Sequence, residues 1–350
     1  MDRSAPYWRR MTRGRAERIA ILGAGSWGTA LAVHLRGTGH DVRLWARDET
    51  LVEGIRAHRI NPRYLSDVTV PEGVLASTDG RAVLDDARTV VVAVPSHVLR
   101  SVVASLRDWI PRDAVLVSAA KGLETSSLSR MSQVIADEMP VGMPVVVLSG
   151  PSFALEVARG LPTAVLAAST DASAAAYIQE CFRGPSLRLY GSDDVAGVEI
   201  GGALKNVIAI AAGVVEGLGL GHNSMAALIT RGLAEISRLA SAEGGRRETL
   251  SGLSGLGDLV LTCTGDLSRN RHVGIELGKG RKLDDVLAGM RMVAEGVRTT
   301  GAAIALGTRH GIELPIASEM SAVLEGRRSA IEAVELLMGR RQRLEPEHQH

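Results

Sequence analysis

The chain has few of the residues that build disulfide frameworks, metal centres or nucleic-acid-binding surfaces. Its 350 residues include two cysteines, Cys181 and Cys263, which are too few for a disulfide framework and do not lie in a metal-ligand spacing. Its nine histidines form no H-x-x-H or H-E-x-x-H cluster, so the sequence predicts no metal site. The net charge is only +1, which argues against general nucleic-acid binding and leaves anion recognition to local clusters.

Long hydrophobic runs are also lacking. No segment reaches the roughly 18 uninterrupted apolar residues of a membrane-spanning helix. The nearest, residues 207–215, follows directly on Lys205 and Asn206, so we expect a buried core helix there. Residues 1–17 are basic but lack the apolar segment of a secretory signal, and we expect them and residues 340–350 to be flexible extensions. These features predict a globular, cytoplasmic protein of two domains.

What the sequence does contain is a glycine-rich turn between an expected strand and an expected helix. Residues 19–28 read IAILGAGSWG, and a helix-forming stretch follows at once. Gly23 permits a tight turn, Gly25 lets the backbone approach a phosphate, and Gly28 lets the helix pack closely on the strand. A second strand at 42–45 completes a βαβ unit. We therefore predict a site for the pyrophosphate of a dinucleotide.

The end of that second strand usually selects the cofactor. Arg47 favours the 2′-phosphate of NADP, whereas Asp48 would accept hydrogen bonds from the ribose of NAD if the register were one residue later. We predict that NADPH is preferred and that NAD is possible. An interpretation of both residues as a solvated loop pair stays open.

Apolar runs without alternation recur through the first half of the chain, as is typical of strands covered on both faces. We expect these strands at residues 90–94, 114–118, 145–148, 163–167 and 187–190. Beyond about residue 191 the pattern changes to helices of 3.6-residue period, expected at 195–218, 224–242, 269–278, 283–288, 297–308, 316–324 and 330–338. The sequence thus predicts an α/β Rossmann domain, doubly wound and mostly parallel, at 18–191, and an all-α domain at 192–339, with a ligand cleft between them.

Two lysines are candidates for chemistry. Lys121 follows an expected strand, at the edge where open α/β sheets bind ligands, although a lone lysine is usually solvated. Lys205 lies with Asn206 inside an apolar helix, where a buried ammonium needs a partner and desolvation lowers its pKa toward the range of proton transfer. We favour a cleft-facing acid/base lysine. A lysine that extends to the surface, with Asn206 capping a helix break, is the alternative.

Two later segments could complete such a site. Asp258 and Thr262 share one face if their segment is helical, and Asp258 either partners Lys205 or caps that helix. Residues 268–270 (SRN) offer a hydroxyl, a guanidinium and an amide at an expected helix start, which is what a phosphate monoester requires. A generic basic patch would look the same.

Taken together, these segments resemble bacterial NAD(P)-dependent sn-glycerol-3-phosphate dehydrogenases from about residue 18 to residue 339. The motifs that carry the resemblance are, in order, 23–30 (GAGSWGTA), 94–97 (VPSH), 121–123 (KGL), 149–154 (SGPSFA), 205–209 (KNVIA), 255–259 (GLGDL), 268–270 (SRN) and 295–296 (EG). The resemblance implies reversible reduction of dihydroxyacetone phosphate to sn-glycerol 3-phosphate by NAD(P)H, without a metal, as a supply for phospholipid synthesis. It also implies a homodimer.

The resemblance further implies a role for each residue. Lys205 would exchange the proton with the substrate oxygen, Lys121 would polarise that oxygen, and Asp258 would orient Lys205 or hold a substrate hydroxyl. Besides these three, the implied substrate contacts are Gly150, Ser152, Ser268, Arg269 and Asn270. The implied cofactor contacts are Gly23, Gly25, Ser26, Trp27, Gly28, Arg47, Tyr64, Lys121, Ala154, Arg269, Val293 and Glu295.

Two other functions stay open. A related Rossmann dehydrogenase acting on 6-phosphogluconate or ketopantoate could use the same lysine and asparagine, and residues 268–270 favour a small phosphate ester over those acids. A non-catalytic dinucleotide sensor would need the glycine turn but would have no use for several cations and a carboxylate at one site.

Overall fold

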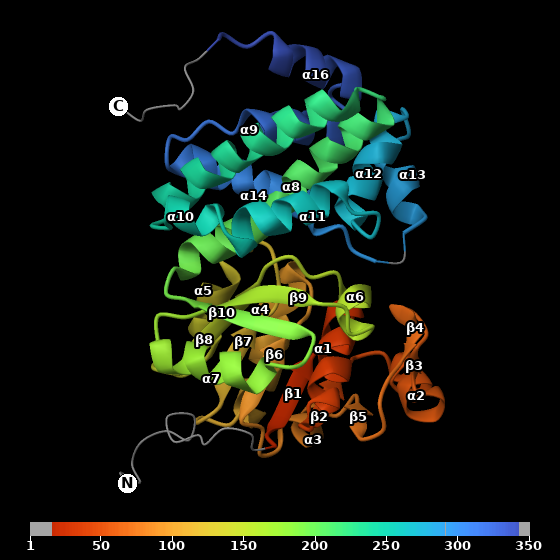
Figure 1. Ribbon diagram of the computed structural model, residues 1–350, viewed down its shortest axis with the longest axis vertical. Coiled ribbons are helices and arrows are strands. Elements are labelled where there is room, and N and C mark those ends of the chain that lie inside the picture. Colours follow the sequence, from red (N-terminus) through yellow and green to blue (C-terminus); the bar gives the residue numbers. More distant parts are fainter. Residues whose placement is uncertain (1–15, 291, 343–350) are drawn as a thin grey trace.

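The computed structural model describes residues 16–290 and 292–342. Figure 1 shows two stacked parts: a sheet covered by helices, which holds the N-terminal half of the chain, and an all-helical domain above it. The predicted fold class, a Rossmann domain followed by an all-α domain, is confirmed.

The sheet has eight strands in the order β10-β9-β8-β7-β6-β1-β2-β5. Their bounds are β1 (Arg18–Leu22), β2 (Asp41–Trp45), β5 (Val74–Ser77), β6 (Thr89–Val92), β7 (Val115–Ser118), β8 (Val145–Ser149), β9 (Thr163–Ala168) and β10 (Leu187–Ser192). All neighbours pair in parallel except β8 and β9, so the last two strands run opposite to the other six. The sequence missed β5 and the small hairpin of β3 (Ile60–Asn61) and β4 (Leu65–Thr69).

Helices cover both faces of this sheet, and each face has its own apolar core. Alternate residues of β1 point to opposite sides, so Ile19 and Ile21 join one core while Ala20 and Leu22 join the other. The covering helices are α1 (Ser26–Gly37), α2 (Glu49–His58), α3 (Gly80–Leu84), α4 (Ser96–Leu106), α5 (Met131–Glu138), α6 (Ala154–Ala158) and α7 (Ala172–Phe182), with a 3₁₀ turn at Arg107–Trp109.

The helical domain is built around α8 (Val195–Gly217), which is buried from Gly197 to Val215. Around it lie α9 (Gly221–Ala242), α10 (Arg247–Leu250), a π-helical turn (Leu253–Gly257), α11 (Asp258–Thr264), α12 (Arg269–Gly278), α13 (Leu283–Ala288), α14 (Glu295–Arg309), α15 (Pro315–Leu324) and α16 (Ala330–Met338).

Helix α8 is long and apolar enough to cross a membrane, but its most apolar window is 100% buried inside the protein. The prediction of a buried core helix is therefore confirmed, and the alternative of a helix break at Asn206 is wrong because α8 continues through it.

Helices α8 and α12 touch backbone to backbone. A Cβ atom on Gly213 would lie 2.0 Å from the carbonyl oxygen of Arg271, and one on Gly274 would lie 1.9 Å from that of Ile210. Real Cβ atoms do not approach this closely, so any larger residue at either position would force the helices apart. The glycines therefore fix α12, and the residues at its start, relative to α8.

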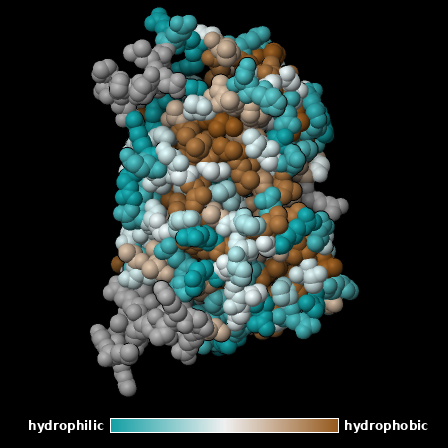
Figure 2. All heavy atoms as spheres, viewed as in Figure 1, coloured by the Kyte–Doolittle hydropathy of each residue, from teal (hydrophilic) through white to brown (hydrophobic). Residues whose placement is uncertain are grey.

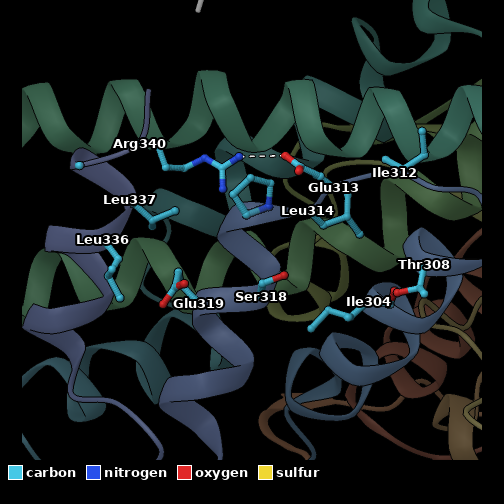
Figure 3. Close-up of a pocket in the computed structure, with 12 residues that line it drawn as sticks. Ile304, Thr308, Ile312, Glu313, Leu314, Ser318, Glu319, Leu336, Leu337 and Arg340 are labelled. Carbon is cyan, nitrogen blue, oxygen red and sulfur yellow. Dashed lines mark hydrogen bonds and ion pairs between the residues drawn. The ribbon is translucent and has the colours of Figure 1, made fainter. Parts of the chain in front are cut away.

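The expected extensions fall largely outside the described residues, which exclude 1–15 and 343–350. At the edges of these extensions, Glu17 and Arg340 are described and make contacts. Glu17 is buried, and its carbonyl accepts a hydrogen bond from the Asp41 N–H at 2.9 Å. Arg340 lies 2.9 Å from Glu313 across a cavity of about 570 Å³ between α14, α15 and α16, which Figure 3 shows. None of the predicted site residues lines that cavity.

Candidate active site

A second, larger cavity of about 1020 Å³ lies between the two domains. The predicted cofactor residues that line it are Gly23, Gly25, Ser26, Trp27, Arg47, Tyr64, Lys121, Ala154, Arg269, Val293 and Glu295. The predicted substrate residues that line it in addition are Ser152, Lys205, Ser268 and Asn270. Gly28, Gly150 and Asp258 are not in its wall. The structure thus brings together, around one cavity, residues that are far apart in the sequence.

The glycine turn has the geometry of a phosphate-binding loop. Gly23 adopts a φ of 117°, and a Cβ on Gly28 would lie 1.9 Å from the Gly23 carbonyl oxygen. A Cβ on Gly25 would meet no atom within 4 Å, so the backbone there is open to a ligand. Helix α1 begins at Ser26 with no side-chain cap and no acidic residue in its first turn. Its N–H groups are therefore left to bind an anion, which fits a dinucleotide pyrophosphate.

One buried carboxylate holds the two candidate lysines. Lys205 Nζ donates to Asp258 Oδ1 at 2.5 Å and to Thr262 Oγ1 at 2.8 Å. Lys121 Nζ donates to Asp258 Oδ2 at 2.6 Å and to the Gly150 carbonyl oxygen at 2.9 Å. Asp258 is fully buried, at 0% exposure. It is the first residue of α11, where it partners Lys205 as well as beginning a helix.

Burial lowers the pKa of Lys205 to about 8. Asp258 opposes this shift because a negative charge favours the ammonium, while the nearby Lys121 adds to it because two positive charges repel. A lysine with a pKa near 8 can give or take a proton close to neutral pH. The site therefore contains a group suited to general acid/base catalysis.

Glycine lets α8 bring Lys205 close to Lys121. A Cβ on Gly202 would lie 2.8 Å from Ser149 Oγ, at the end of β8, and 3.7 Å from Lys121 Cγ. A larger side chain at this position would push α8 away from the sheet. The contact explains how lysines from two domains come to share one carboxylate.

Residues 268–270 lie at the start of α12, as expected, and each of the three side chains already has a hydrogen-bond partner within the protein. The Ser268 hydroxyl caps α12 by accepting the Arg271 N–H at 3.2 Å. Asn270 accepts the Gly296 N–H and donates to Asn206 Oδ1, both at 2.9 Å. Arg269 donates to the Val293 carbonyl oxygen at 3.1 Å and is the one of the three that brings a positive charge to the cavity.

Arg47 and Asp48, which follow β2, differ in their contacts. Arg47 is exposed and has neither a hydrogen bond nor an ion pair within residues 16–290 and 292–342. Asp48 caps α2 by accepting the Leu51 N–H at 3.3 Å, and its other oxygen lies 3.0 Å from Arg63. The arginine is therefore open to a ligand, while the carboxylate is bound within the protein.

Two features at this cavity were not predicted from the sequence: the contact between Glu295 and Ser96, and the position of Arg63. Glu295, at the start of α14, accepts hydrogen bonds from the Ser96 hydroxyl at 2.5 Å and the Ser96 N–H at 3.1 Å, and so joins the helical domain to the start of α4. Arg63 also lines the cavity. In the described part of the chain, no group of three His, Cys, Asp or Glu side chains is arranged to hold a metal ion.

This fold and this cavity define an NAD(P)-dependent dehydrogenase, because the dinucleotide turn and the two lysines line the same cavity. Family models described as the N-terminus and the C-terminus of NAD-dependent glycerol-3-phosphate dehydrogenase match residues 18–175 and 194–335. The chain belongs to this family.

Relatives extend over nearly the whole chain. Glycerol-3-phosphate dehydrogenase (NAD(P)+) of Acidobacterium capsulatum is 53% identical over 331 residues, covering 92% of this chain and 98% of the relative. The enzyme of the same name from Koribacter versatilis is 53% identical over 327 residues, covering 92% and 97%. The crystal structure of glycerol-3-phosphate dehydrogenase from Coxiella burnetii has a TM-score of 0.89 at 40% identity and covers 93% of this chain and 99% of that one.

Proposed function

We propose that this chain catalyses the reversible reduction of dihydroxyacetone phosphate to sn-glycerol 3-phosphate, with NADPH preferred and NADH possible. The observation that carries the proposal is the pair of lysines on Asp258 in the wall of the dinucleotide cavity. The names of the relatives support the substrate. The product would supply phospholipid synthesis.

The charges of the site suit this reaction. When bound, the nicotinamide supplies the hydride that reduces the carbonyl carbon. The carbonyl oxygen then becomes negative, and Lys205 donates a proton to it while Lys121 stabilises the charge. In the reverse direction Lys205 accepts the proton of the alcohol. Asp258 holds both ammonium groups in place through 2.5 and 2.6 Å contacts.

Arg269 is the cation we assign to the substrate phosphate, because it projects into the cavity from the start of α12. Ser268 and Asn270 would join it by exchanging their present partners for phosphate oxygens. Gly150 and Ser152 would contact the substrate from the end of β8, where the Ser152 hydroxyl donates to the Gly150 carbonyl oxygen at 2.9 Å.

We assign the pyrophosphate to the turn from Gly23 to Gly28, including Ser26 and Trp27, and the 2′-phosphate of NADP to Arg47. The remaining cofactor contacts we propose, all in the cavity wall, are Tyr64, Lys121, Ala154, Arg269, Val293 and Glu295. The N–H groups at the start of α1 support this placement, as does the guanidinium of Arg47, which has no partner among the residues that the structure describes.

We also propose a cytoplasmic homodimer. Cyclic dimers are the commonest oligomers, and Figure 2 shows hydrophobic residues gathered on one face of the helical domain, which a second copy could cover. Both cysteines are free and buried, which fits a reducing compartment. A small phosphate ester is the partner we expect, with no nucleic acid.

The deciding experiment follows NADPH absorbance on addition of dihydroxyacetone phosphate. For comparison, 6-phosphogluconate is tested as a substrate for oxidation and ketopantoate as a substrate for reduction. We expect turnover with dihydroxyacetone phosphate and at least about a hundredfold lower kcat/KM with the two acids, since they lack its phosphate-to-ketone spacing. Preference for either acid would contradict the proposed substrate. Tight NADPH binding with no turnover on any compound would favour a dinucleotide sensor.

A further inference from the structure

A second arginine lies beside Arg47 in the wall of the dinucleotide cavity. Arg63 follows the short strand β3, lines the same cavity as Arg47, and is paired with Asp48 at 3.0 Å. Its guanidinium carbon lies 5.9 Å from the centre of the Tyr64 ring, within the range of a cation–π contact. Arg47, Asp48, Arg63 and Tyr64 are called here the adenosine-end cluster, because they lie where the ribose end of a dinucleotide meets a Rossmann sheet.

An acidic side chain at this place ordinarily accepts hydrogen bonds from the ribose hydroxyls of NAD. In this cluster both oxygens of Asp48 are already bonded within the protein. One of its oxygens accepts the N–H of Leu51 and the other is paired with Arg63. A carboxylate used in this way is poorly placed to accept hydrogen bonds from two ribose hydroxyls, as an NAD-selective site would require. Two guanidiniums and one carboxylate also leave the cluster with a net charge of +1, which favours a ligand with an extra phosphate.

The position of Arg63 is more restricted than that of Arg47. Arg63 is paired with Asp48 and lies against the Tyr64 ring, while 54% of its side chain stays exposed. A planar guanidinium that is held in place loses less rotamer entropy when it binds, and it offers several N–H donors to phosphate oxygens.

We propose that Arg63 is a second guanidinium for the 2′-phosphate of NADP, and that Asp48 is the positioning residue that orients it. The inference rests on the cofactor half of the proposed function, and it assigns the preference for NADPH to two arginines from different segments. Asp48 then supports selection of NADP through Arg63, although an acidic residue at this end of the sheet ordinarily indicates NAD.

The test measures dissociation constants rather than turnover. Quenching of the fluorescence of Trp27 and Trp45, which line the cavity, reports binding of NADPH and NADH, and competition with 2′-AMP and 5′-AMP isolates the contribution of the 2′-phosphate. The variants are Arg63→Ala, Arg63→Lys and Arg47→Ala. Arg59→Ala is the matched control, because Arg59 lies in the same segment and pairs with Glu72 at 2.9 Å but is not in the cavity wall.

We expect Arg63→Ala to weaken NADPH and 2′-AMP by about tenfold to a hundredfold, the range for a lost hydrogen bond to a charged group, while NADH and 5′-AMP change by less than about threefold. Arg63→Lys should lie between wild type and Arg63→Ala, since it keeps the charge and loses the fork of donors. Arg59→Ala should bind all four ligands as wild type does.

Two results would overturn the inference: equal loss of NADPH and NADH in Arg63→Ala, which would mean that Arg63 shapes the cavity or contacts adenine, and unchanged affinity for both. Either result leaves the reduction of dihydroxyacetone phosphate to be judged by its own assay. Conversely, a selective loss of NADPH in a protein that reduces no ketone would support the role of Arg63 and refute the proposed reaction.

Discussion

Replacing Lys205 by alanine tests the proposed chemistry most directly, because the structure indicates that the variant keeps its fold. Asp258, which is fully buried, retains the contact with Lys121 at 2.6 Å and so is not left as an unpaired charge. The methylene groups that alanine removes can be restored by Lys205→Met, which separates the loss of the ammonium from the loss of volume. The turn around Gly23 and Gly25 lies on the other domain and is untouched.

The expected loss is two to four decades in turnover, the usual contribution of one general acid/base. The wild-type pH profile should identify the same group, because the pKa of Lys205 is about 8. Ketone reduction uses the ammonium and should fall by about tenfold per pH unit above that value. Alcohol oxidation uses the neutral amine and should rise toward the same value, so the two limbs have opposite signs.

The assay is NADPH oxidation at saturating dihydroxyacetone phosphate, with NADPH binding measured separately. We expect both Lys205 variants to bind NADPH within about threefold of wild type and to lose the limb near pH 8. Lys279→Ala, at an exposed lysine of the same domain, controls for the removal of one positive charge. Near-normal turnover in Lys205→Ala would refute the assignment of the proton to this residue.

Three further results are expected. Asp258→Asn removes the charge that raises the pKa of Lys205, so the reductive limb should move to lower pH, and an unmoved limb would speak against the shared carboxylate. Gly28→Ala places a Cβ 1.9 Å from the Gly23 carbonyl oxygen and should abolish dinucleotide binding in a titration, whereas Gly37→Ala, with no atom within 4 Å, should bind normally. Glu235 is a buried residue of α9, and burial raises its pKa to about 7 from 4.5. The stability it contributes is therefore full below pH 4.5 and is lost as the pH rises through 7. Urea unfolding at pH 5 and pH 8 should show wild type losing roughly 2.5 kcal/mol relative to Glu235→Gln across that range, and equal pH slopes would contradict the burial argument.

The parts of the fold that the sequence predicts are those with a strong local pattern. The strand before Gly23 and the helix after Gly28 follow from the glycine spacing, and α8 follows from its apolar composition. Strand β5 escapes prediction because it is a four-residue edge strand whose Leu75 is 56% exposed. The reversed direction of β9 was not predicted either, because the apolar run of a buried strand does not show which way the strand runs. The structure accounts for the reversal, since only the five-residue α6 lies between β8 and β9, where a parallel connection would need a full crossover helix.

For the site, the sequence predicts which residues line the cavity but not which partners they have. Residue types and positions predict which side chains reach the cavity, since the ends of parallel strands meet at one edge of a sheet. The partner that each side chain has is settled by packing between distant segments, and sequence spacing carries no information about it. From the sequence, Asp258 could be assigned to Lys205 or to a helix cap, and Asp48 to a ribose or to a solvated loop. The folded chain adds Lys121 as a partner of Asp258 and Arg63 as a partner of Asp48.

The bridge between Lys121 and Asp258 crosses from one domain to the other, and this links acid strength to the shape of the molecule. Parting the domains would take Lys121 away from Asp258, and with it the repulsion that makes the Lys205 ammonium more acidic. With the domains apart, the Lys205 ammonium would be a weaker acid, and with the domains together it would be a stronger one. Lys205 would therefore be the better proton donor when the two domains are together.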